Sequence, residues 1–165
     1  MKACFIGLGY IGLPTAIVAA DNGIEVVGVD VNPHVVETIN KGKIHIVEPG
    51  LADLAAKVVH NGGLRAQLEP EVSDVYLIVV PTPFTGDHEP DISYVEAATR
   101  SVIPYLKEGD LYIIESTSPV GTTEQMAELI FAERPELKGK IFIAYCPERV
   151  LPGNIIYELV HNDRV

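Results

Sequence analysis

The sequence is short of basic residues, of cysteine and of long apolar runs. Twelve Lys and Arg stand against 23 Asp and Glu, a formal charge of −11. Nucleic acids and anionic membranes are bound through clustered Lys and Arg, so neither is an expected partner. Two cysteines make no disulfide framework, and no apolar run approaches the roughly 18 residues needed to span a bilayer. The N-terminus MKACFIG lacks the layout of a signal peptide. We therefore expect a cytoplasmic domain with reduced thiols.

Short β-branched runs alternate with helix-length amphipathic stretches, which predicts repeated βα units around a parallel sheet. The expected strands are Ala3–Leu8, Glu25–Asp30, Leu64–Leu68, Val75–Val80, Leu111–Glu115 and Ile141–Tyr145. The expected helices are Leu13–Asn22, Pro33–Lys41, Leu51–His60, Ile92–Leu106 and Thr122–Glu133. Near-continuous Val, Ile and Leu content indicates strands covered on both faces. The predicted fold is α/β, a Rossmann-type doubly wound, mostly parallel six-stranded sheet, and the 165 residues fit one domain.

Two segments carry weaker expectations. Pro81–Asp91 (PTPFTGDHEPD) is expected to be a long polar loop at the carboxyl end of a strand, where ligands bind in open α/β sheets. Its acidic residues and histidine, Asp87, His88, Glu89 and Asp91, could suggest a metal cluster. Crowding along one loop does not bring ligands together, so we expect a solvated loop and no metal. The last residues, Asn162–Val165, resemble the approach to another strand.

Gly7-Leu8-Gly9-Tyr10-Ile11-Gly12 forms a G-x-G-x-x-G between the first expected strand and the first expected helix. In a dinucleotide site Gly7 would permit the tight turn, Gly9 would let the backbone approach a pyrophosphate, and Gly12 would allow close helix–strand packing. The start of the following helix would offer N–H groups and a positive dipole end to the phosphates. The motif taken alone is weak evidence, because glycines also serve tight turns that bind no ligand.

Asp30 ends the second expected strand, about twenty positions after the glycines, where a dinucleotide site places its acidic residue. Its carboxylate can accept hydrogen bonds from both adenosine ribose hydroxyls, a contact worth roughly 1.5–3 kcal/mol. The same charge would repel a 2′-phosphate, and no Arg or Lys follows in residues 31–34 to offset it. The pattern therefore favours NAD over NADP as cofactor.

Two further loops follow strands on the same expected edge. In ESTSPVGTTE (residues 115–124), Thr122 or Thr123 could simply cap a helix, with the acidic residues favouring its first turn. Alternatively, Thr117 and Thr123 point into the crevice and reach the nicotinamide half and the reacting water or sugar. Thr82, fixed between two prolines, is placed to contact the cofactor's ribose or phosphates, or else belongs to a stiff strand exit.

Five phrases, GLGYIGLP, VGVDVNP, VPTPF, ESTSPVGTTE and CPERVLPG, occur in order across nearly the whole chain. Together they resemble the N-terminal domain of the UDP-glucose/GDP-mannose dehydrogenase family. That family oxidises the C6 alcohol of a nucleotide sugar to a carboxylate with two NAD in succession. HIVEP and GDHEPD are similar to the branch that acts on UDP-N-acetyl-D-mannosamine. The resemblance implies a UDP-sugar substrate and a parent enzyme that is a homodimer.

The resemblance also implies roles for individual residues. Tyr10, Ile11, Asp30, Thr82 and Thr123 are expected to touch NAD, in addition to the glycines. Substrate contacts are expected from Glu148, Arg149 and Val150. Arg149 suits a forked contact with substrate oxygens, and Glu148 could take or orient a proton, although the two could also form a surface pair. We name Thr117 and Glu148 as catalytic candidates.

One position departs from the family pattern. Family members that act on UDP-glucose carry a second glutamate four residues after the first, credited with helping to hydrolyse a thioester. Pro152 occupies that position here. Proline cannot transfer a proton, so this role does not carry over, and the mannosamine-type branch is favoured over UDP-glucose.

Cys146, at the tip of the last expected strand, raises the question of a catalytic thiolate. The family does not use this position, and its nucleophilic cysteine and assisting lysine lie beyond the cofactor domain. We therefore expect Cys146 to be a small apolar side chain. We also expect residues 1–165 to be an NAD-binding Rossmann domain that ends before the central helix and C-terminal domain of a longer enzyme, inactive alone.

Two other functions fit parts of this pattern. A stand-alone NAD-binding sensor or regulatory module would need no second domain. A dehydrogenase of another class, such as the 3-hydroxyacid or 6-phosphogluconate type, also begins with a similar glycine loop. Those classes lack the combination of STSPVG and PERVLPG found here.

Overall fold

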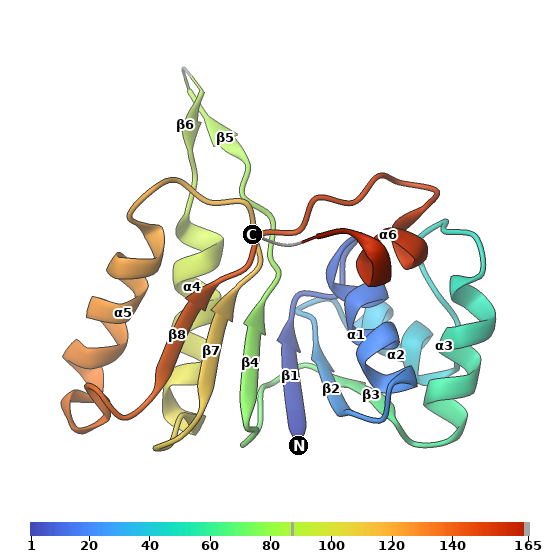
Figure 1. Cartoon of the computed structure of the whole chain (residues 1–165), viewed down its shortest axis with the longest axis horizontal. Coiled ribbons are helices and arrows are strands. Elements are labelled where there is room, and N and C mark those ends of the chain that lie inside the picture. Colours follow the sequence, from blue (N-terminus) through green and yellow to red (C-terminus); the bar gives the residue numbers. More distant parts are fainter. Residues whose placement is uncertain (87, 164–165) are drawn as a thin grey trace.

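A computed structural model describes residues 1–86 and 88–163 of the chain. Six strands form one parallel sheet in the order β3-β2-β1-β4-β7-β8 (Figure 1). Their bounds are β1 (Lys2–Ile6), β2 (Glu25–Val29), β3 (Leu64–Gln67), β4 (Val75–Ile78), β7 (Leu111–Ile114) and β8 (Phe142–Tyr145). The predicted Rossmann-type α/β fold is confirmed, and the strand order reverses between the neighbours β1 and β4.

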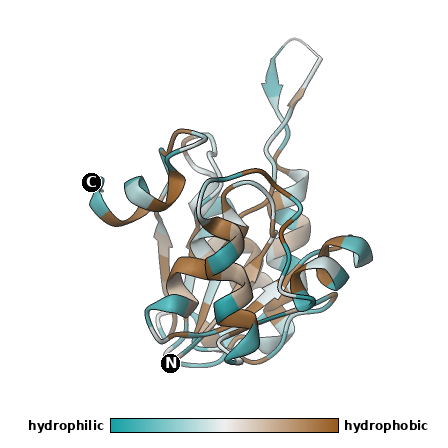
Figure 2. Ribbon diagram, turned by 90° about the vertical axis from the view of Figure 1, so that its right-hand side faces the viewer, coloured by the Kyte–Doolittle hydropathy of each residue, from teal (hydrophilic) through white to brown (hydrophobic). Residues whose placement is uncertain are grey.

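Helices cover the sheet on both sides, α1, α2 and α3 on one face and α4 and α5 on the other, while the short helix α6 lies beside α1 (Figure 1). The helices are α1 (Gly12–Asp21), α2 (Pro33–Asn40), α3 (Leu51–His60), α4 (Ser93–Val102), α5 (Thr122–Glu133) and α6 (Ile155–His161), with 3₁₀ turns η1 (Ile103–Tyr105) and η2 (Pro135–Leu137). In Figure 2, apolar and polar residues alternate along the helices nearest the viewer, as expected of helices with one buried side. Within the described residues no helix is long and apolar enough to cross a membrane.

The central strand β1 shows how the two layers arise. Its side chains alternate between faces, as in any strand. Cys4 and Ile6 belong to the core under α4 and α5, and Ala3 and Phe5 belong to the core under α1, α2 and α3. All four side chains are buried, so β1 is covered on both faces as predicted.

The edge strand β8 differs from the prediction of strands covered on both faces. Phe142 is 67% exposed and Tyr145 is 43% exposed. Among the described strands, β8 pairs with β7 alone, so one of its edges also lacks a neighbour. The apolar composition of Ile141–Tyr145 predicted the strand correctly but not its position at the rim of the sheet.

Two further elements correct the sequence-based expectations. The expected loop at Pro81–Asp91 contains an antiparallel hairpin of β5 (Phe84–Thr85) and β6 (Glu89–Pro90), which projects from the domain in both views (Figures 1 and 2). Asp87 lies outside the described residues, and among those described no three His, Cys, Asp or Glu are grouped to hold a metal. The helix α6 precedes the expected strand approach, whose last residues, 164 and 165, also lie outside the described part.

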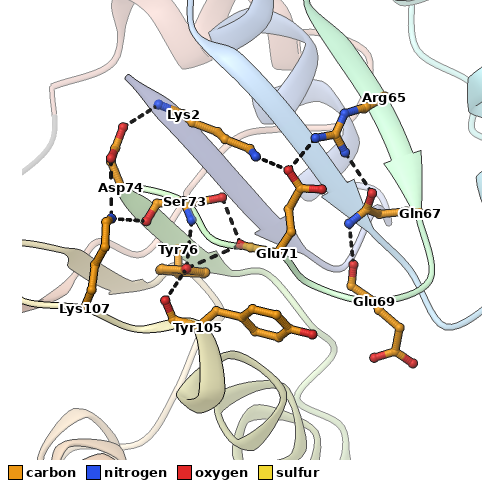
Figure 3. A network of polar contacts seen from close by, with 10 residues as sticks. All are labelled: Lys2, Arg65, Gln67, Glu69, Glu71, Ser73, Asp74, Tyr76, Tyr105 and Lys107. Atoms are coloured by element: carbon orange, nitrogen blue, oxygen red, sulfur yellow. Dashed lines mark hydrogen bonds and ion pairs between the residues drawn. The ribbon is translucent and has the colours of Figure 1, made fainter.

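The amino-terminal edge of the sheet is held by a polar network (Figure 3). The Glu71 carboxylate accepts hydrogen bonds from both Lys2 and Arg65 and so joins β1, β3 and the segment before β4. The buried Tyr76 hydroxyl accepts the Ser73 N–H at 2.9 Å. These contacts fix the edge of the sheet opposite the glycine loop, and they leave the carboxyl edge for a ligand.

Candidate dinucleotide and substrate site

A cleft of about 780 Å³ opens at the carboxyl edge of the sheet, where β1 and β4 are neighbours. Its walls come from the segments that follow β1, β2, β3, β4 and β7, and from one side of α4. Open α/β sheets bind ligands at such a reversal of strand order, because the connections leave in opposite directions and leave a crevice between them.

The three glycines of the first loop are needed for different reasons. Gly7 has a φ of 101°, and a Cβ there would lie 2.3 Å from the Val79 carbonyl oxygen. A Cβ at Gly12 would lie 2.0 Å from the Gly7 carbonyl oxygen, so the helix start packs against the loop. Gly9 lines the cleft, and a Cβ there would meet nothing within 4 Å. The fold requires Gly7 and Gly12, while Gly9 leaves open space on the side of the cleft.

Asp30 follows β2 directly and faces the glycine loop. One carboxylate oxygen accepts the Leu8 N–H at 3.1 Å, and the other accepts the Asn32 N–H at 2.9 Å. These bonds orient the carboxylate at the wall of the cleft and leave further lone pairs for a ligand. A carboxylate held in this way can accept hydrogen bonds from the hydroxyl groups of a ligand.

The cleft wall is acidic. Among the described residues that line it, four carry carboxylates and none is Lys or Arg: Asp30, Glu69, Glu115 and Glu148. A phosphate would therefore depend on backbone N–H groups and on the dipole of α1. The first turn of α1 has no acidic residue, and no side chain caps it. Within α1 the Leu13 N–H already donates to the Gly9 carbonyl oxygen and Pro14 has no N–H, so a bound anion would depend on the N–H groups of the glycine loop before Leu13.

The exits of β4 and β7 are joined by two hydroxyl side chains. Thr82 donates a hydrogen bond to the Thr117 carbonyl oxygen at 2.7 Å, and both residues line the cleft. The buried Ser116 hydroxyl accepts the Val80 N–H at 2.9 Å and lies 2.8 Å from the Val80 carbonyl oxygen. Sequence reasoning missed Ser116, which holds Thr82 and Thr117 on adjacent loops.

Thr123 lies apart from this group. Gly121, with a φ of 92°, is the N-cap residue of α5, and no side chain caps the helix. The suggestion that Thr122 or Thr123 caps the helix is therefore wrong, because the left-handed glycine turns the chain into the helix without a hydroxyl. Thr123 is half-buried in the first turn, and the described wall of the cleft does not include it.

A second hollow of about 390 Å³ adjoins the first. Glu148 lines both hollows. Arg149 lines the second, together with residues 145–147 before it and residues 162–163 after α6. The Arg149 N–H donates to the Glu148 carboxylate at 2.7 Å. Arg149 is exposed and Val150 is half-buried. Glu148 is thus the predicted site residue at which the two hollows meet.

One wall of the cleft comes from α4, which sequence reasoning did not assign to the site. The contributing side chains, spaced i, i+3, i+4 and i+7 on one helix face, are Tyr94, Ala97, Ala98 and Ser101. Three small residues at helical spacing mark a face that a ligand or another segment can approach closely. This spacing was the signal available in the sequence. Val31 and Leu68 add further apolar surface to the cleft.

The two cysteines have different surroundings. Cys4 is fully buried in β1, and burial raises the pKa of its thiol to about 11. A thiol with a raised pKa is a poor nucleophile near neutral pH. Cys146 follows β8 and is half-buried beside Glu148 in the second hollow.

A glycine loop between β1 and α1, an oriented carboxylate after β2 and a cleft at the sheet's reversal define a Rossmann dinucleotide-binding domain. Residues 1–165 match the model of the UDP-glucose/GDP-mannose dehydrogenase family, NAD binding domain. The chain belongs to this family, and NAD is its cofactor.

Individual relatives agree with this assignment. The chain is 56% identical over 168 residues to UDP-N-acetyl-D-mannosamine dehydrogenase of Escherichia coli (strain K12), and 55% identical to NDP-N-acetyl-D-galactosaminuronic acid dehydrogenase of Ralstonia nicotianae. Both alignments cover 97% of this chain and 40% of the relative. The structure of UDP-N-acetyl-mannosamine dehydrogenase from Staphylococcus aureus superposes with a TM-score of 0.95 at 42% identity, covering 99% of this chain and 40% of that one. The chain therefore spans about two fifths of the length of these relatives.

Proposed function

We propose that the chain is the NAD-binding part of a nucleotide-sugar 6-dehydrogenase that oxidises UDP-N-acetyl-D-mannosamine to the uronic acid with two NAD. Relatives named for that sugar, at 56% identity, support the choice of substrate. Pro152, in place of the second glutamate of the UDP-glucose branch, supports it independently. The parent enzyme is proposed to be a cytoplasmic homodimer.

The observation that carries this proposal is the position of Glu148. It lies on the wall of the dinucleotide cleft and also on the wall of the adjoining hollow. A dehydrogenase needs its reacting carbon within reach of the cofactor. A carboxylate at the junction of two hollows is placed to orient a substrate alcohol or to accept its proton.

The remaining residues divide the binding of the two ligands between them. We assign the pyrophosphate to the backbone of Gly7–Gly12, with Tyr10 and Ile11 at the cleft wall, and the adenosine ribose to Asp30. Thr82 and Thr117 face the nicotinamide half, and Thr123 is retained as a cofactor contact from the family resemblance. When bound, NAD supplies the hydride acceptor for each oxidation.

On the substrate side, Arg149 supplies a forked cation for sugar-nucleotide oxygens. Val150, the next residue along the chain, is retained as a substrate contact from the family resemblance. Thr117 and Glu148 are proposed as the catalytic pair in this chain, because both line the cleft in which the cofactor would lie. The nucleophilic cysteine and its assisting lysine are proposed to lie outside these 165 residues, as the family resemblance implies. Burial raises the pKa of the Cys4 thiol to about 11, which makes it a poor nucleophile.

The proposal predicts that the 165-residue chain binds NAD⁺ but does not oxidise the sugar. Isothermal titration should give a saturable signal for NAD⁺ and a weaker one for NADP⁺, because Asp30 repels a 2′-phosphate. No NADH absorbance should appear with UDP-N-acetyl-D-mannosamine. Absence of NAD⁺ binding would refute the cofactor assignment, and turnover by this chain would refute the assignment of the nucleophile elsewhere.

A matched pair of variants sharpens the test. Asp30→Asn keeps the shape of the side chain but removes its charge, and should weaken NAD⁺ binding about tenfold or more, equivalent to ~1.4 kcal/mol. Asp53→Asn removes the same charge from an exposed position on α3 and should leave the affinity unchanged. Equal effects from both would mean that Asp30 acts only through the net charge.

A further inference from the structure

Glu48 is a buried carboxylate far in sequence from its partners. It is 5% exposed and lies in the connection between α2 and α3. One oxygen accepts the Gly153 N–H and the other accepts the Ile155 N–H, both at 2.8 Å. Burying a carboxylate is costly unless hydrogen bonds satisfy it, and here two backbone donors do so. The two bonds attach residues 153–155 to a segment more than 100 positions earlier.

The segment that carries Glu48 also contacts the glycine loop. The Tyr10 hydroxyl donates a hydrogen bond to the Val47 carbonyl oxygen at 2.9 Å. Tyr10 lines the dinucleotide cleft, and Val47 is the residue immediately before Glu48. Residues 47–48 therefore touch the cofactor loop through one residue and the C-terminal loop through the next.

The C-terminal loop carries the proposed substrate residues. Glu148 and Arg149 precede Gly153 by a few positions, and the loop between them has no regular secondary structure. Its backbone is held at Leu151, whose N–H donates to Glu158 at 2.9 Å, and at the two bonds to Glu48. Glu158 belongs to α6, whose residue Ile156 packs against the core under α1, α2 and α3. Of the carboxylates that bond this loop, Glu48 is the one that comes from outside the C-terminal segment.

We propose that Glu48 is a positioning residue that holds the Glu148–Gly153 loop in place relative to the glycine loop, so that a dinucleotide bound at Gly7–Gly12 also orders the substrate loop. This inference rests on the proposed function. Binding orders Tyr10 against the ligand, Tyr10 steadies Val47, and Glu48 transmits the loss of motion to residues 153–155. Two ligands that order the same segments favour each other's binding.

The chemistry of the side chain makes the role specific to glutamate. Both carboxylate oxygens accept, and each faces a backbone donor. In Glu48→Gln one oxygen becomes an NH₂ group, which would face an N–H donor. One of the two bonds is then lost and the buried N–H is left unsatisfied. The variant therefore loosens the loop with little change of volume.

Amide hydrogen exchange, measured by NMR on the 165-residue chain with and without NAD⁺, tests the proposal. In the wild type, NAD⁺ should slow exchange at Leu8 and Gly9, and should also slow it at Gly153 and Ile155 by about threefold or more. In Glu48→Gln, exchange at the last two amides should be faster and should not respond to NAD⁺. Glu128→Gln, which removes an exposed charge on α5, should behave as the wild type.

A second variant separates coupling from simple stability. Tyr10→Phe keeps both bonds of Glu48 but removes the hydroxyl that reaches Val47. Exchange at Gly153 and Ile155 without NAD⁺ should be unchanged, and its slowing by NAD⁺ at saturation should disappear. This result does not depend on whether Glu48→Gln folds, and a purely structural role for Glu48 would not produce it.

The outcomes distinguish this inference from the proposed function. If NAD⁺ protects no amide of the glycine loop, the cofactor site itself is wrong. If NAD⁺ protects Leu8 and Gly9 in the wild type but leaves Gly153 and Ile155 unchanged, the cofactor site stands and the coupling is overturned. Retention of the NAD⁺ response in Tyr10→Phe would overturn the path through Val47.

Discussion

At the scale of single residues, the glycine loop shows that one motif combines folding and binding requirements. Neighbouring carbonyl oxygens leave no room for a side chain at Gly7 or Gly12. A Cβ at Gly7 would lie 2.3 Å from the Val79 oxygen, and a Cβ at Gly12 would lie 2.0 Å from the Gly7 oxygen. Gly9 meets no protein atom within 4 Å on that side. The sequence motif predicts all three positions equally, and the structure separates the two glycines that the packing requires from Gly9, which lines the cleft and has room for a side chain.

Gly9→Ala and Gly12→Ala should therefore fail in different assays. Gly9→Ala should keep its stability and lose NAD⁺ affinity about tenfold or more, because the added methyl group enters the cleft. Gly12→Ala should lower the free energy of unfolding by about 1–3 kcal/mol, because its methyl group overlaps the Gly7 carbonyl. Urea denaturation and isothermal titration of both variants check this. A stable Gly12→Ala chain, or full affinity in Gly9→Ala, would contradict the separation.

At the scale of elements, the sequence was informative where a pattern is local and uninformative where a partner is distant. The six strands and five longer helices follow from short apolar runs and amphipathic spacing, and the structure contains them all. Five of the six predicted strands ran one or two residues too far at the carboxyl edge, and the sixth ended correctly at Tyr145. For example, β1 ends at Ile6 because Gly7 turns the chain with a φ of 101°.

The elements that were missed depend on tertiary contacts. Helix α6 has seven residues, and its first residue, Ile155, is fully buried and bonded to Glu48. Short isolated helices are marginal in water, so the local sequence gives little signal. The hairpin β5–β6 has two residues in each strand and includes Pro90, which normally argues against a strand. The wall of the cleft on α4 was missed for the same reason, because tertiary packing and not a local sequence motif places that helix face at the site.

The Glu71 network at the amino-terminal edge of the sheet should make the free energy of unfolding depend on pH. Lys2 and Arg65 hold the pKa of the Glu71 carboxyl at about 2, chiefly through the hydrogen bond from Arg65. A lowered pKa in the folded state means that the contribution to stability is complete above about pH 4.5, the unfolded value, and is lost as pH falls toward 2. The stability difference between the wild type and Glu71→Gln should thus be largest near neutral pH and vanish near pH 2.

Urea denaturation of both chains across this pH range measures that difference. Glu128→Gln serves as the control, because Glu128 is exposed on α5, away from the network in Figure 3. A difference that stays constant with pH would show that Glu71 contributes through packing and not through its ion pairs.

At the scale of the whole molecule, the net negative charge of the chain opposes the binding of a ligand that is itself negatively charged. The chain carries a formal charge of −11, and four of its carboxylates lie on the described wall of the cleft, which includes no Lys or Arg. A ligand with two phosphates would approach against this field, and in the proposed site backbone N–H groups of the glycine loop and the dipole of α1 would then hold it. The attraction between N–H groups and phosphates acts at contact distance, whereas the repulsion by the carboxylates acts over a longer range. Salt therefore weakens the repulsion more than the attraction.

Raising the ionic strength should therefore strengthen NAD⁺ binding. The Debye length falls from about 30 Å at 0.01 M salt to about 8 Å at 0.15 M, which screens distant carboxylates more than the amides in contact with phosphate. We expect an increase in affinity of about twofold to fivefold over this range, equivalent to ~0.4–1 kcal/mol. Titrations at several salt concentrations measure it, and neutral adenosine should show little change. A steep loss of affinity with salt would instead mean that Lys or Arg side chains bind the phosphates.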